Sequence, residues 1–152
     1  MKLVCNGVVL ALFFTVISFS CSKSSVNEFQ PLKSVQVVAA ADANRHLPVV
    51  LDLVFVYNQI LREKLASMSA TAWFAEKRDL LKRNAGLIRV ASERIAPGAQ
   101  RSITNFPPDH DIAMACYVFI NYISPGTHRA LLPSGKSVRI TLREKNFEVS
   151  RR

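Results

Sequence analysis

The side chains best suited to chemistry are the acidic and imidazole groups of Asp109, His110 and Asp111, with His128 and His46 elsewhere in the chain. Carboxylates and imidazoles bind transition metals, but a closed zinc site requires three or four ligands that converge on one point. Successive residues of a turn or strand point in different directions, so these three neighbours do not converge by themselves. The sequence therefore predicts neither a metal site nor a bound cofactor.

Catalytic motifs with a fixed spacing are absent from the sequence. It contains no glycine-rich phosphate loop, no nucleophile elbow and no metalloprotease helix motif. A hydrolase that used His110 or His128 would need a nucleophile and a base that converge in space, and no spacing in the sequence indicates them. We therefore expect that the protein is not an enzyme.

The beginning of the chain, Met1–Cys21, has the layout of a secretory signal. Lys2 is followed by the apolar run Val8–Ile17, and small residues precede Cys21. The apolar run has about half of the ~20 residues that a membrane-spanning helix requires. We expect residues 1–20 to form a signal peptide that is removed before Cys21.

The residues at the expected cleavage site, Ile17–Cys21, resemble the lipobox of bacterial lipoproteins, in which the cysteine thiol is acylated before cleavage. Phe19 is bulkier than the residue usual at its position. The resemblance implies that Cys21 is lipidated; the alternative is ordinary cleavage, which would leave Cys21 with a free thiol. Ser22 stands where an Asp would favour retention in the inner membrane, so we expect a lipid anchor in the outer membrane of a Gram-negative bacterium, on its periplasmic face.

Removal of 20 of the 152 residues leaves 132, which suits one domain. Lys2 is the only charged residue removed, so 19 Lys and Arg remain against 11 Asp and Glu. A basic surface suits nucleic acid, anionic lipid or an acidic protein partner, and export argues against nucleic acid. Cys116 would be the only other cysteine left, among apolar neighbours, and we expect it to be a buried hydrophobic side chain rather than a nucleophile.

The pattern of the remaining chain predicts a polar, flexible tether at 21–32 and a domain at 33–152. The first strand is expected at Lys33–Ala40 and the second at Val49–Tyr57, whose two apolar faces predict a central position in a sheet. Asp52 interrupts one of these faces. We expect its carboxylate to bond to a neighbouring loop or to pair with an arginine, because buried charges are normally paired.

Between about 58 and 84 the apolar residues recur at helical spacing, and Ser69 is a predicted N-cap. Trp73 and Phe74 lie on this stretch and are expected in the core. From Leu87 to Ser150 short strands alternate with turns, and the longest of them is expected at Ile112–Tyr122. Seven or eight short strands predict a mainly β protein, a β-sandwich with a helical insertion between its second and third strands.

Three stretches, taken in this order, resemble one family: VVAAADANRHLPVVLDLVFVY (Val37–Tyr57), WFAEKRDLL (Trp73–Leu81) and APGAQRSI (Ala96–Ile103). This is the TssJ (SciN, VasD) family, the outer-membrane lipoprotein of the type VI secretion system. The resemblance implies a transthyretin-like sandwich that anchors the trans-envelope complex by binding the periplasmic C-terminal domain of a TssM-type inner-membrane protein. In that family the loop between the first two strands makes the contact. Here that loop contains Ala41, Asp42, Ala43, Asn44, Arg45 and His46.

A second interpretation of the same exported domain is a periplasmic lipoprotein that binds a small ligand or a glycan. Sugar and other ring-shaped ligands are commonly held against aromatic faces, and Trp73, Phe74 and Tyr122 would be the stacking residues. An apolar pocket that opens to solvent would support this interpretation.

Overall fold

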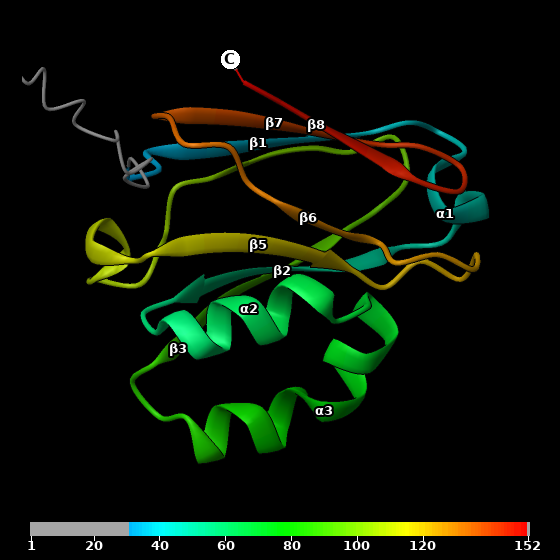
Figure 1. The fold of residues 1–152 in the computed structure, drawn as a ribbon. Helices are drawn as coiled ribbons and strands as arrows, with labels where there is room; N and C mark the ends of the chain where they lie inside the picture. The colour runs from blue at the N-terminus through cyan, green and yellow to red at the C-terminus, as the bar shows by residue number, and fades with distance from the viewer. Residues whose placement is uncertain (1–30, 152) are drawn as a thin grey trace, which may run out of the picture.

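The computed structural model describes residues 31–151, and these form two four-stranded sheets with two helices against one of them (Figure 1). The first sheet has the strand order β4-β1-β7-β8 and the second has the order β3-β2-β5-β6. β1 and β7 are parallel, and the other neighbouring strands are antiparallel. In chain order the elements are β1 (Ser34–Ala39), α1 (Ala43–His46), β2 (Val49–Val56), α2 (Gln59–Ser67), α3 (Ala70–Arg83), β3 (Ile88–Ile95), β4 (Gln100–Ile103), the 3₁₀ turn η1 (His110–Ile112), β5 (Ala115–Ile120), β6 (Arg129–Leu131), β7 (Ser137–Leu142) and β8 (Phe147–Arg151).

The main hydrophobic core lies between the two sheets. Alternate residues of β1 and β7 point inward, as the period-2 pattern of a half-buried strand requires. Leu32, at the end of the predicted tether, is also fully buried in this core and therefore belongs to the folded domain. The largest fully buried side chains of this core are Leu32, Leu51, Leu53, Phe55, Ile95, Ile120, Leu132 and Ile140.

A second core lies between the second sheet and the helices α2 and α3 (Figure 1). The inner strands β2 and β5 contribute to both cores: Phe55 faces the first sheet, whereas Val54 and Val56 face the helices. Trp73 of α3 is completely buried and stacks on Phe119 of β5, with ring centroids 5.1 Å apart. The predicted sandwich, the helical insertion between the second and third strands and the central position of β2 are therefore confirmed.

Side-chain caps fix the beginning of both insertion helices. Asn58 Oδ1 accepts a hydrogen bond from the Leu61 N–H at the start of α2, and Ser69 Oγ accepts one from the Ala72 N–H at the start of α3. Each cap satisfies a backbone donor that has no partner within its helix and stabilises it by about 1 kcal/mol. No helix in residues 31–151 is long and apolar enough to cross a membrane.

The start of β5 differs from the prediction. The sequence predicts a strand over Ile112–Tyr122, but residues 110–112 form a 3₁₀ turn, and the Ala113 N–H donates to His110 O. The turn takes Ile112 out of the alternating pattern and leaves its side chain 72% exposed. The strand begins at Ala115, opposite Val56.

Asp52 is fully buried beneath α3, on the helix side of β2. Its carboxylate accepts hydrogen bonds from Trp73 Nε1 at 2.8 Å and from Ser92 Oγ, and Lys77 Nζ lies 2.8 Å away. The expected arginine partner was wrong: the cation is a lysine of the insertion helix. These contacts join α3 to the sheet. They account for the burial of the Asp52 carboxylate as part of the fold.

Candidate functional site: the loop between β1 and β2

The loop between β1 and β2 turns through three consecutive residues in the left-handed region. Asn44, Arg45 and His46 have φ values of 49°, 52° and 64°, so α1 is a left-handed turn. This conformation costs residues other than glycine roughly 1–2 kcal/mol each, and Asn tolerates it better than most. The loop therefore needs hydrogen bonds from outside itself to hold its shape.

The Asn44 side chain supplies those bonds from inside the protein. It is 1% exposed; its Oδ1 accepts from the Ile123 N–H at 2.8 Å and its Nδ2 donates to Pro48 O at 3.4 Å. The Asn44 N–H donates to Arg143 O at 3.1 Å. The turn is thereby tied to the segment after β5 and to the β7–β8 hairpin, and both contacts are far away in sequence.

The residues of the predicted contact loop fall into two groups. Ala43 and Asn44 are buried, whereas Ala41, Asp42, Arg45 and His46 are exposed. Two large apolar side chains belong to the same surface: Leu47 follows the turn and is 49% exposed, and Ile123, bonded through its N–H to Asn44, is 54% exposed. Sequence reasoning missed this pair because neither belongs to a regular pattern. We call Ala41, Asp42, Arg45, His46, Leu47 and Ile123 the loop-end surface.

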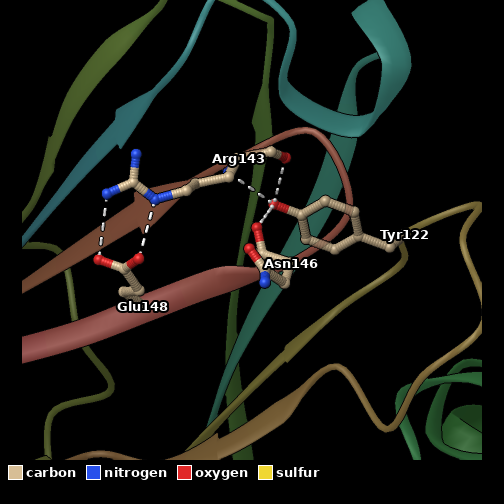
Figure 2. Close-up of polar contacts among 4 residues, drawn as sticks. All are labelled: Tyr122, Arg143, Asn146 and Glu148. Carbon is tan, nitrogen blue, oxygen red and sulfur yellow. Dashed lines mark hydrogen bonds and ion pairs between the residues drawn. The ribbon is translucent and has the colours of Figure 1, made fainter.

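Tyr122 bonds to the turn of the β7–β8 hairpin, the same turn to which the Asn44 N–H donates (Figure 2). Its hydroxyl donates to Asn146 O at 2.6 Å and accepts from the Arg143 N–H at 3.2 Å. Its ring stacks on His128, with centroids 4.8 Å apart. Burial raises the pKa of Tyr122 to about 12, so the hydroxyl stays neutral in the folded protein at ordinary pH.

The β7–β8 hairpin also carries an exposed ion pair (Figure 2). Arg143 binds both oxygens of Glu148, with Nε to Oε1 at 2.9 Å and Nη2 to Oε2 at 3.2 Å. The hydrogen bond from Arg143 lowers the pKa of the Glu148 carboxyl. An exposed pair of this kind contributes little to stability. The hairpin is held by the pairing of β7 with β8 and, at its turn, by the Tyr122 hydroxyl.

The other residues considered for chemistry lie apart from one another. His110 is held by Pro107 O and Leu32 O, and His128 Nε2 lies 2.7 Å from Ser124 O. Among residues 31–151 there is no group of three or more side chains that could hold a metal. Cys116 is a free, buried thiol whose pKa is raised by burial, which suppresses the thiolate. The predicted lipidation site, Cys21, lies outside the described residues.

The aromatic platform required for a small ligand or glycan is not formed. Trp73 is completely buried, and Tyr122 is almost so because it packs under the hairpin. The groove between β6 and β8 is lined by residues 125–130 and by Lys145, Asn146, Phe147 and Val149, and it contains none of the three predicted stacking residues. The prediction of Trp73 and Tyr122 as stacking residues was therefore wrong, and the half-buried Phe74 packs against the core between the second sheet and the helices.

No protein-family model matches this sequence, and no curated protein is similar enough to it in sequence to be a relative. Solved structures do match. The T6SS lipoprotein TssJ1 from Pseudomonas aeruginosa superposes with a TM-score of 0.61 and 16% identity, over 82% of this chain and 97% of TssJ1. A chain of a type VI membrane complex matches with a TM-score of 0.63 and 14% identity, over 82% of this chain and all of that one. The chain has the fold of type VI secretion lipoproteins.

A third match is a chain in the structure of the T6SS protein TssM C-terminal domain from EAEC. It has a TM-score of 0.60 and 16% identity and covers 77% of this chain and 98% of that chain. In all three comparisons nearly the whole of the similar chain is matched. The three matches, which cover 77 to 82% of this chain, therefore share its overall fold.

Proposed function

We propose that this protein is a TssJ-like lipoprotein of a type VI secretion membrane complex. It is a structural, non-enzymatic component that is acylated at Cys21 and held on the periplasmic face of the outer membrane. Its partner is the periplasmic C-terminal domain of a TssM-type inner-membrane protein. The observation that carries the proposal is the match, at TM-scores of 0.60 to 0.63, to a type VI lipoprotein, a type VI membrane complex chain and a TssM-domain structure.

The geometry of the domain suits an anchor at one end and a contact at the other. Leu32, where the chain enters the sandwich, lies at the start of β1, and the loop-end surface follows the end of the same strand. Figure 1 shows the two at opposite ends of the molecule. A molecule that joins a membrane to a protein requires this separation, because both attachments must be made at once.

The loop-end surface is the proposed contact for the TssM-type domain. Its turn is held by Asn44 and the hairpin, so little conformational entropy is lost when a partner binds. Leu47 and Ile123 offer apolar area beside the cation of Arg45. Interfaces of this kind draw most of their affinity from a few central apolar and arginine side chains.

The test is calorimetric titration of the full chain with the TssM-type periplasmic domain from the same organism. The double variant Arg45→Glu, Leu47→Ser is expected to bind at least about tenfold more weakly, since both are candidate central contacts, while its melting temperature is unchanged. Lys136→Glu, at the opposite end, is the control and keeps wild-type affinity. Unchanged affinity in the loop variant, or no binding by the wild-type chain, would refute the proposed contact.

A further inference from the structure

The end of the sandwich where the chain enters carries most of the exposed apolar side chains. Of the seven large hydrophobic residues that are exposed within residues 31–151, five lie there, and the other two, Leu47 and Ile123, lie at the loop end. Ile112 and Met114 project from the segment before β5, and Leu131 ends β6. The remaining two, Ile60 and Leu87, begin α2 and precede β3. Apolar side chains gathered at one end of a domain mark a contact surface.

Basic residues surround these side chains. Three of them stand at the same end of neighbouring strands: Lys33, Lys136 and Arg151. The Lys33 N–H donates to Lys136 O at 2.7 Å, and Arg151 of β8 lies opposite Val138 of β7. Arg62 and Arg151 line one hollow together with Met114 and Leu131, and no acidic residue lines it. Within residues 31–151 none of these four cations forms an ion pair.

The acidic residues at this end are mostly engaged. Asp109 accepts hydrogen bonds from Arg89 Nε and Tyr57, and Glu63 accepts one from Gln59. Glu63, whose donor Gln59 is neutral, and the exposed Asp111, beside Ile112, keep their charges. Four cations without ion pairs in the described residues therefore face two such carboxylates, and the charge of this end is still positive.

The position of the chain entry indicates what lies against this surface. His110 Nε2 is 3.1 Å from Leu32 O, so the segment that carries Ile112 packs directly on the entering chain. Ten residue positions separate Cys21 from Pro31, and ten residues span at most about 35 Å. A lipid on Cys21 would therefore keep this end of the domain within that distance of the bilayer.

We propose that this end docks on the membrane. The anchor-end surface, which we define as Lys33, Lys136, Arg151, Ile112, Met114 and Leu131, lies against the bilayer. Its cations contact the phosphates of anionic phospholipid headgroups, and its apolar side chains enter the interfacial region. The inference rests on the proposed acylation of Cys21, which brings the surface to the membrane. The docked domain presents the loop-end surface away from the bilayer, toward its partner.

The experiment measures co-flotation of the full chain with vesicles, using Cys21→Ser so that acylation does not dominate binding. Vesicles of phosphatidylethanolamine and phosphatidylglycerol are compared with vesicles of phosphatidylcholine. We expect tighter binding to the anionic vesicles, reduced by salt because exposed charges are screened beyond a Debye length of about 10 Å at 0.1 M. The double variant Lys136→Glu, Arg151→Glu should weaken this binding by at least about 20-fold. Each cation near an anionic surface contributes about 1 kcal/mol to binding, and this variant removes two of them.

Matched variants at the opposite end are the controls. Arg45→Glu with Lys145→Glu changes the net charge by the same amount and is expected to leave vesicle binding unchanged. Ile112→Ser with Met114→Ser should weaken binding severalfold, whereas Leu47→Ser with Ile123→Ser should not. All variants keep the same residues 1–31, so any contribution of that segment cancels, and melting curves verify that each is folded.

Three results would overturn the proposal. The first is equal binding to both kinds of vesicle, and the second is an equal loss of vesicle binding in the anchor-end and loop-end charge variants. The third is loss of binding to the TssM-type domain by the anchor-end variants. The last would make this surface a protein interface. Failure of the proposed function is detected separately, by mass spectrometry of the Cys21 residue in the wild-type chain and by titration with the TssM-type domain. The two proposals can therefore fail independently.

Discussion

The two ends of the sandwich differ in how their surfaces are built. At the loop end the exposed residues sit on a left-handed turn whose buried Asn44 is bonded to two distant segments. At the anchor end the exposed residues are side chains at the ends of strands and on a 3₁₀ turn, with few polar contacts around them. A shape held by specific hydrogen bonds suits recognition of one protein, whereas dispersed charge and apolar area suit a fluid surface. The difference supports separate partners for the two ends.

The largest effect is expected from Cys21→Ser, which would remove the proposed lipid link between the anchor end and the membrane. If Cys21 is acylated, the protein should leave the membrane fraction and its N-terminal peptide should lose the mass of the acyl chains. Docking by the anchor end alone is reversible and salt-sensitive, so a high-salt wash should release the variant. Retention of the variant in washed membranes, with no acylated peptide in the wild type, would contradict the proposed anchor.

Asn44→Ala tests the rigidity of the loop end. It removes the hydrogen bonds to the Ile123 N–H and Pro48 O and places alanine in the left-handed region. We expect a loss of about 2–4 kcal/mol in the free energy of unfolding, with weaker binding to the TssM-type domain. Asn44→Gly keeps the left-handed backbone conformation accessible and should lose less of the free energy of unfolding. Asn105→Ala, on the surface, should lose almost none of it. Equal losses in all three would refute the role assigned to Asn44.

Tyr122→Phe tests the support behind that turn. It removes the hydroxyl that bridges the β7–β8 hairpin and should cost about 1–2 kcal/mol near neutral pH. The folded pKa of Tyr122 is raised to about 12 from 10.0, so the stability that its neutral form provides is complete below pH 10 and is lost as the pH rises through 12. Denaturant titrations at pH 9 and 11 should therefore show a steeper decline for the wild type than for Tyr122→Phe. Parallel declines would contradict this assignment.

The smallest effect is expected from Glu148→Gln. The Arg143–Glu148 pair is exposed on both sides, and such pairs contribute little. The melting temperature and the affinity for the TssM-type domain should both match the wild type within error. A marked loss of either would show that the ion pair, rather than Tyr122 and Asn44, fixes the loop end.

The parts of the fold that follow from repetitive patterns could be predicted from the sequence. Alternation along β2 and β5, the Ser69 cap and the helical spacing of Trp73 each reflect one physical rule acting over several residues, and the structure confirms them. The start of β5 could not be predicted from the sequence, because Ile112 and Met114 continue the alternating pattern of the strand back to a 3₁₀ turn. Apolar residues that are exposed for contact are indistinguishable in sequence from core residues.

The sequence predicted where the candidate loop lies in the chain, but not which of its side chains are exposed. The polar run at 41–46 indicated an exposed loop, yet which of its side chains are buried depends on Ile123 and Arg143, about 80 to 100 residues away in the chain. The backbone N–H groups of Leu47 and Ile123 both bond to Asn44, so the same long-range contact brings these two residues to one surface. Likewise, the carboxylate of Asp52 required a cation, but only the packing of α3 places Lys77 rather than an arginine beside it.

The parallel pairing of β1 with β7 has a consequence for the order of folding. Ser34 Oγ lies 3.1 Å from Ser137 Oγ, so the first strand finds its neighbour 103 residues later. Its other neighbour, β4, is an edge strand of four residues. Contacts this distant in sequence form slowly. If the chain is exported as proposed and emerges N-terminus first, its first sheet cannot be completed until nearly all of the chain has crossed the membrane, because β7 must emerge before it can pair with β1.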